Sequence, residues 1–121
     1  MNTIDRMVDL ELPDNPGHKL CFTIRSITEC EKELINHNLI LTIAGMAAAP
    51  LAVGDVFTLL KWGLLGGGKY SQDEVEIIFM ECVDELGLVG LQEKVVLALE
   101  KSGIIGKVKN KAALPKEKKR K

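Results

Sequence analysis

The sequence predicts an α+β, mostly α-helical fold, in which an amino-terminal β-hairpin is followed by a bundle of four or five short helices. Residues 6–25 alternate apolar and polar side chains on both sides of a turn, which is typical of half-buried strands. Residues 27–103 instead repeat apolar side chains every three or four positions, the period of an amphipathic helix. Because 46% of the 121 residues are hydrophobic, we expect one folded domain over 1–106, with a basic, flexible and disordered tail over 107–121.

The hairpin is predicted from RMVDLEL at 6–12 and KLCFTIR at 19–25, with the turn-rich PDNPGH between them. A two-stranded hairpin is marginal in water by itself, so its apolar face should lie on the helices. The side chains expected on that face are Val8, Leu10, Leu12, Leu20, Phe22 and Ile24.

The first helix is predicted from two overlapping capping boxes, Ser26 with Glu29 and Thr28 with Glu31. In a capping box a hydroxyl and a carboxylate satisfy the free amides at a helix start. The helix should continue to about Ile35. Its inward residues are expected to be Ile27, Cys30 and Leu34.

The next segment, residues 39–48, is apolar almost throughout, so a buried strand and a buried helix both fit it. Its length and alanine content favour a helix. Pro50 suits the first turn of the following helix, where its missing amide costs nothing. The buried stripe of that helix is predicted to be Val53, Val56, Phe57, Leu60 and Leu64.

The clearest helix signal follows. Ser71 and Glu74 form another potential capping box, and Gly87 offers a left-handed cap at the other end. A last helix is predicted over 91–102, with Gly103 as its stop. The inward residues of these two helices are expected to be Val75, Ile78, Phe79, Cys82, Val83, Leu86, Leu91, Val95, Ala98 and Leu99.

Between these helices lies GGGK. A phosphate-binding loop needs Ser or Thr after the lysine, and Tyr70 stands there instead. We therefore interpret Gly66, Gly67 and Gly68 as a helix end and a hinge. Trp and Tyr are enriched in binding patches, so the candidate partner-binding residues beside the hinge are Trp62, Leu65 and Tyr70, with core packing as the alternative role for Trp62.

Charge divides the chain in two. Residues 1–106 hold eight basic and sixteen acidic residues, a net charge of −8, whereas residues 107–121 hold eight basic residues and one glutamate, a net charge of +7. The basic tail is the strongest feature for nucleic-acid contact. The acidic body would repel a polyanion, however, and no aromatic residues are interleaved for base stacking. A solubilising or partner-binding tail is favoured over nucleic-acid binding.

The residue types that carry catalysis form no recognisable site in the sequence. His18 and His37 have no serine, cysteine or carboxylate pattern that indicates a triad, and the acidic residues over 73–85 lack the ligand spacing of a calcium loop. The three cysteines show no CxxC pair, and their odd number fits a reducing cytoplasm. We expect no enzyme activity, cofactor or metal.

Membrane insertion and secretion are also not expected. The longest apolar stretch, Leu39 to Val53, is only about fifteen residues and contains Gly45 and Pro50, so it is too short and too broken for a membrane span. MNTIDRMVDLEL lacks the apolar run of a secretory signal. These features predict a cytoplasmic protein.

Five segments of the chain, taken in order, resemble the tail assembly chaperones of long-tailed bacteriophages and their prophage relatives. These segments are RMVDLEL, KLCFTIRSI, LTIAGMAAAPLAVGDVFTLLKWGLLGGG, YSQDEVEIIFMECVDELG and LQEKVVLALEKSGIIG. The resemblance covers about residues 6–106 and rests on helix periodicity and caps. It implies a non-enzymatic factor of the host bacterial cytoplasm that binds the tape measure protein, promotes polymerisation of the tail tube protein and is absent from the mature virion. A nucleic-acid-associated regulator that uses the basic tail is the alternative.

Members of this family are often also made in a longer form by ribosomal frameshifting on an adenine-rich stretch. Lys118 and Lys119 are residues that such a stretch could encode. The resemblance therefore implies a frameshifted longer form as a further partner. The sequence leaves the oligomeric state open, with a homo-oligomer as one candidate.

Overall fold

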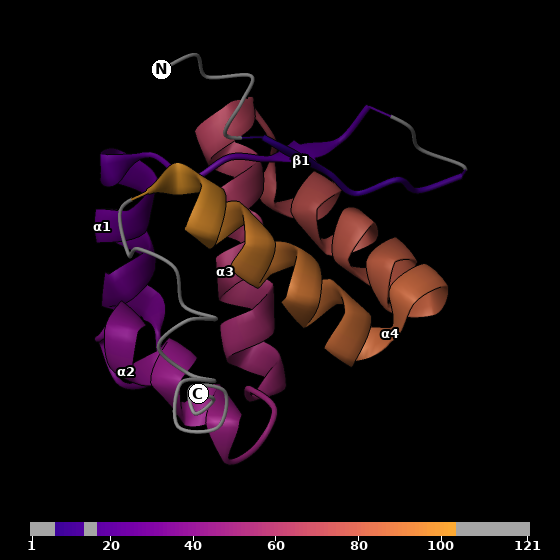
Figure 1. Ribbon diagram of the computed structural model, residues 1–121. Coiled ribbons are helices and arrows are strands. Elements are labelled where there is room, and N and C mark those ends of the chain that lie inside the picture. The colour runs from indigo at the N-terminus through magenta and orange to yellow at the C-terminus, as the bar shows by residue number, and fades with distance from the viewer. Residues whose placement is uncertain (1–6, 14–16, 104–121) are drawn as a thin grey trace, which may run out of the picture.

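The computed structural model describes residues 7–13 and 17–103, and it confirms a small, mostly helical domain with an antiparallel hairpin at its amino-terminal end (Figure 1). Helix α3 lies at the centre, with α1 on one side, α4 on the other and β2 against it. The elements in chain order are β1 (Val8–Asp9), β2 (Lys19–Leu20), α1 (Ile24–Glu33), α2 (Leu39–Ala44), the 3₁₀-helix η2 (Gly45–Ala47), α3 (Val53–Gly67) and α4 (Gln72–Ser102). The tail predicted over 107–121 lies outside the described residues.

The hairpin pairs Val8 with Leu20 and Asp9 with Lys19, and its strands are shorter than predicted. Beyond Leu20 the chain leaves β1, because the Cys21 amide donates to the Gly63 carbonyl oxygen of α3 at 2.9 Å. The predicted inward face is confirmed except at one position. The buried members are Val8, Leu10, Leu12, Leu20 and Phe22. Ile24 was wrongly assigned to the strand, since it begins α1 and is 66% exposed.

Helix α1 begins earlier than predicted, because Thr23 is its N-cap. The Thr23 hydroxyl accepts a hydrogen bond from the Ser26 amide at 3.1 Å, and the Ser26 hydroxyl accepts one from the Thr23 amide at 2.9 Å. The predictions that this helix is capped by Ser26 or Thr28, and that the helical region begins at residue 27, are therefore wrong, because α1 begins at Ile24. The inward residues Ile27, Cys30 and Leu34 are buried as predicted.

Within the predicted segment 39–48, residues 39–47 are helical, as their length and alanine content favoured, and form α2 and η2, with a turn at Ala48. Pro50 is not in the first turn of the next helix, because α3 begins at Val53 with Ala52 as its N-cap. Of the predicted stripe on α3, Val53 is 53% exposed and Phe57 is half-buried. The buried members are Val56, Leu60 and Leu64.

The capping box at the start of α4 is confirmed, with the Ser71 hydroxyl accepting from the Glu74 amide at 3.1 Å and the Glu74 carboxylate accepting from the Ser71 amide at 2.7 Å. The long element is broken at Gly87, whose φ of 76° and ψ of 163° are not helical and are open to glycine at little cost. The two halves therefore correspond to the two predicted helices, and Gly103 ends the second in a left-handed conformation.

Candidate partner-binding surfaces

Trp62 is half-buried on α3 and is held against α1. Its indole N–H donates to the Glu33 carboxylate at 3.1 Å. The Lys61 ammonium pairs with the same carboxylate at 3.1 Å and lies 5.2 Å from the centre of the indole ring. These contacts fix the orientation of Trp62, so the part of the ring that remains exposed is a rigid feature of the surface.

Tyr70 is also half-buried, but it lies beside the hairpin rather than beside α1. Its hydroxyl is 3.0 Å from His18 Nδ1, and the two rings are tilted with centres 5.6 Å apart. Burial raises the pKa of Tyr70 above its ordinary value, so the phenol stays protonated at neutral pH. Leu65 is half-buried on α3. The structure thus gives Trp62 and Tyr70 different neighbours, and partner binding by Trp62, Leu65 and Tyr70 stays a prediction.

The three glycines end α3, as expected, with Gly68 as the C-cap in an extended conformation. Gly66 has a packing reason to be glycine, because a Cβ there would overlap the Cys21 carbonyl oxygen. A Cβ on Gly67 would lie 3.4 Å from the Cys21 Cβ, an ordinary contact. Whether Gly66, Gly67 and Gly68 act as a hinge stays a prediction. Lys118 and Lys119 lie outside the described residues.

A surface that the sequence did not single out lies on α2 and on the chain before and after it, at the end of the molecule opposite the hairpin (Figure 1). We call it the apolar end surface and define it by Ile35, Ile40, Leu41 and Val53, which are 66%, 55%, 60% and 53% exposed. Residues 38–54 contain no charged side chain. Because exposed apolar patches mark interaction sites in proteins, this surface is a candidate docking site.

The segment that carries the apolar end surface is anchored at three places. Glu31 accepts a hydrogen bond from the Leu39 amide at 2.8 Å, and buried Asp55 accepts one from the Ile35 amide at 3.1 Å. Gln92 of α4 accepts one from the Leu51 amide at 2.8 Å. Two carboxylates and one amide group thus satisfy backbone amides of this segment. The sequence signal for such a surface is the run without charged residues at 38–54, a pattern that also fits a buried core.

A second exposed face runs along the first half of α4. We call it the outer α4 face and define it by Asp73, Glu76, Ile77, Met80 and Asp84. These positions are three or four residues apart and so lie on one side of the helix. Two large apolar side chains are exposed at its centre, Ile77 at 60% and Met80 at 56%. The face is therefore apolar in the middle and acidic at both ends.

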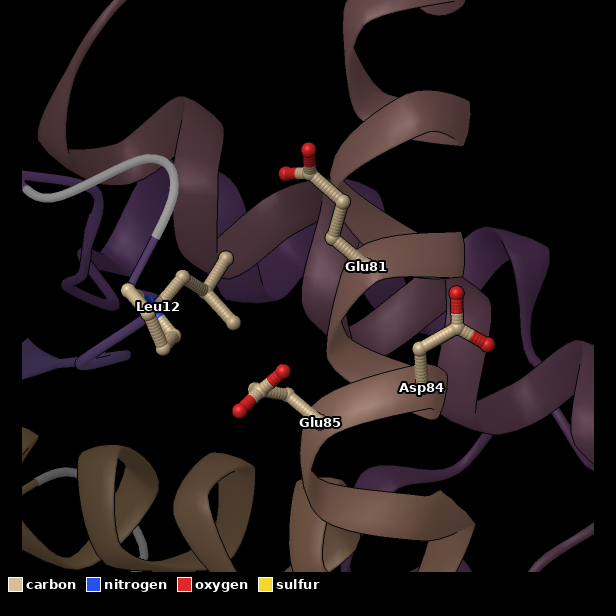
Figure 2. Close-up of a pocket in the computed structure, with 5 residues that line it drawn as sticks. Leu12, Glu81, Asp84 and Glu85 are labelled. Carbon is tan, nitrogen blue, oxygen red and sulfur yellow. The ribbon is translucent and has the colours of Figure 1, made fainter.

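Next to this face is a small pocket of about 140 Å³ between the hairpin and α4. Figure 2 shows the Glu85 carboxylate directed toward Leu12, whereas the Asp84 carboxylate points away. The lining residues are Leu12, Pro13, Glu81, Asp84 and Glu85. The pocket is well below the volume of about 300–1,000 Å³ that drug-sized ligands need. The described part of the chain holds no group of three or more His, Cys, Asp or Glu side chains placed to bind a metal ion.

All three cysteines are buried and belong to no disulfide, as their spacing and number suggested. Burial raises the pKa of Cys30 and of Cys82 to about 12, so both thiols are protonated at neutral pH. Since the thiolate is the nucleophilic form, Cys30 and Cys82 are packing residues rather than reactive ones.

No protein-family model matches this chain, and neither the curated proteins nor the solved structures yield a match. Within 7–13 and 17–103, no helix is long and apolar enough to cross a bilayer.

Proposed function

We propose that this protein is a non-enzymatic tail assembly chaperone of long-tailed bacteriophages that binds the tape measure protein and promotes tail tube polymerisation. The class of protein comes from the sequence resemblance. The observation that supports it in the structure is the apolar end surface, where large apolar side chains lie exposed on an uncharged segment of an acidic body.

The physical basis of binding would be a helix-on-surface contact. A tape measure protein is long and helical, and an amphipathic helix lays its apolar stripe on an apolar surface of its partner. Ile40 and Leu41 are adjacent on α2 and still expose more than half of their area. Covering each would contribute about 1 kcal/mol, because full burial of such a side chain is worth about 1.5–3 kcal/mol.

The acidic body adds a second property that suits a chaperone. Residues 1–106 carry a net charge of −8, which disfavours polyanions and other acidic proteins as partners of this part of the chain. The partner contact is then selected by apolar complementarity at one end of the molecule. We propose action in the host bacterial cytoplasm, absence from the mature virion, and additional contacts with the tail tube protein and with a frameshifted longer form or a second copy of the chain.

The direct test is binding of the full chain to the cognate tape measure fragment, measured by titration calorimetry. Ile40→Asp places a charge on the apolar end surface and should weaken binding about tenfold or more. Ile24→Asp is the matched control, because Ile24 is exposed to a similar extent on α1, outside this surface. An aspartate at the start of a helix is tolerated, so the control should bind like the wild type.

Two outcomes would contradict the proposal. Well-folded protein that shows no binding to the fragment at micromolar concentrations would remove the tape measure protein as partner, and equal weakening by both variants would remove the apolar end surface as the site.

Trp62 is the only tryptophan, so its emission also reports whether the partner covers that region. Deleting residues 107–121 should leave tape measure binding intact, whereas a nucleic-acid-binding protein that uses this tail would lose its binding.

The frameshifted longer form can be tested on the gene itself. A slippery heptamer near the codons for Lys118 and Lys119, followed by an overlapping reading frame, is expected. Its absence would exclude the longer product.

A further inference from the structure

The outer α4 face carries a strong charge imbalance as well as exposed apolar side chains. Residues 72–86 contain six acidic residues and no basic one. Asp73, Glu76 and Asp84 of the outer α4 face are exposed, and the Glu76 carboxylate accepts a hydrogen bond from the neutral side-chain amide of Gln72 at 3.1 Å. The outer α4 face thus presents exposed negative charge around Ile77 and Met80, and the basic residues of α4, Lys94 and Lys101, both belong to the second half of the helix.

The chain itself contains a segment with the complementary chemistry. Residues 104–121 read IIGKVKNKAALPKEKKRK. They combine eight basic residues and one glutamate with the apolar residues Ile104, Ile105 and Val108. Basic side chains match the acidic ends of the outer α4 face, and apolar side chains match its centre. We propose that residues 104–121 dock on the outer α4 face of the same molecule.

The covalent connection makes this contact feasible. The segment follows Gly103 directly, at the end of α4, and its eighteen residues can span up to about 60 Å when extended. The first half of α4, fifteen residues, is only about 22 Å long. A tethered segment meets its target at a millimolar effective concentration, so individually weak, exposed ion pairs are sufficient to hold it.

The other exposed surfaces fit this segment less well. The carboxylates beside the apolar end surface, those of Glu31 and Asp55, already accept hydrogen bonds from backbone amides. Glu33 and Glu11 are already paired with Lys61 and Lys94 at 3.1 and 3.0 Å. Docking on α4 would cover Ile77 and Met80 and neutralise most of the negative charge of the body.

Paramagnetic relaxation in the full chain tests the proposal. Ala113→Cys places one reactive thiol in the middle of the segment without changing its charge, because the native cysteines are buried. With a spin label on that thiol, amide signals from Asp73 to Asp84 should lose most of their intensity at low salt. The signals should recover in about 1 M salt, where the Debye length is only about 3 Å.

Charge variants of the spin-labelled chain locate the contact. The triple change Asp73→Asn, Glu76→Gln and Asp84→Asn should lower the docking constant about tenfold, since it removes three exposed ion-pairing groups. Glu93→Gln is the matched control, because Glu93 is also exposed on α4 but belongs to its second half. This control should leave the signal losses unchanged, and unaltered amide spectra elsewhere would show that all variants are folded.

Three results would overturn the proposal. Undiminished signals over 73–84 at low salt would show that the segment does not dock there, and losses centred on the apolar end surface would assign it to another site. A mixture of spin-labelled chains and isotope-labelled chains separates docking within one molecule from exchange between molecules. Losses of the same size in that mixture would show that the segment binds a second copy, contrary to the proposal.

Discussion

Gly66 lies so close to the main chain of Cys21 that an alanine side chain does not fit between them. A Cβ at position 66 would overlap the Cys21 carbonyl oxygen and lie 3.1 Å from the Ser26 hydroxyl oxygen. The carbonyl group cannot move aside freely, because the Cys21 amide donates to the Gly63 carbonyl oxygen at 2.9 Å and so fixes this segment on α3. We expect Gly66→Ala to force α3 and residues 19–21 apart.

The size of the effect follows from two opposed contributions. Replacing glycine with alanine inside a helix favours folding by about 1 kcal/mol. Overpacking costs about 1–3 kcal/mol, and the cost should lie at the upper end here because the overlapping atom belongs to the backbone. The net free energy of unfolding should therefore fall by about 2 kcal/mol. For a domain of this size that corresponds to a Tm lower by roughly 8–16 °C.

Thermal and urea unfolding, both followed by helical circular dichroism, measure this loss. Gly54→Ala is the matched control in the same helix, since nothing lies within 4 Å of the added Cβ. It should raise the free energy of unfolding by about 0.4–1 kcal/mol. If Gly66→Ala is as stable as the wild type, or if both substitutions shift stability in the same direction, the close packing of α3 on the Cys21 main chain is wrong.

Three further predictions concern stability. Ser71→Ala removes the hydroxyl that caps α4 and should lower the free energy of unfolding in urea by about 1 kcal/mol. Asp55→Ala removes the acceptor of the Ile35 amide and should lower it by about 1–2 kcal/mol in the same assay. Burial raises the pKa of Cys30 and Cys82 to about 12, above the ordinary value of 9.0, so the folded state holds these protons longer than the unfolded chain does. Stability measured in urea should therefore fall as the pH rises from about 9 toward 12.

Each of these predictions has its own control. Thr28→Ala alters an exposed hydroxyl inside α1 and should cost less than the loss of the α4 cap. Asp55→Asn keeps an acceptor oxygen and should retain more stability than Asp55→Ala, and equal losses would contradict the hydrogen-bond explanation. A variant with both Cys30→Ala and Cys82→Ala should show a shallower alkaline decline, and an unchanged slope would assign that decline to other groups.

Local sequence patterns were sufficient where the interaction spans one helical turn. Ser71 and Glu74 are three residues apart, and their reciprocal hydrogen bonds need no other part of the chain. The start of α1 shows the limit of such patterns. Ser26 acts as the third helical residue that bonds back to Thr23, whereas its spacing to a glutamate indicated that it was the N-cap itself.

The candidate surfaces were harder to predict than the helices. Trp62 and Tyr70 were selected because aromatic residues are common in binding patches, and in the structure each is half-buried against another element. Ile40 and Leu41 lie in a segment that we expected to be buried, yet both are exposed. Residue type alone cannot tell these cases apart, because exposure depends on which elements are available to cover a side chain.

The sequence by itself determined the order of hairpin and helices, the inward face of most helices, the break at Gly87 and the division of charge between body and tail. These features depend on backbone preferences and on the period of apolar side chains, which act over a few residues. Only the tertiary structure decided that the chain after β2 leaves β1 and bonds to Gly63, that Gly66 must lack a side chain, and that α2 leaves apolar residues uncovered. Each of those outcomes requires segments far apart in the chain to meet, and their distances in space are not encoded in any local pattern.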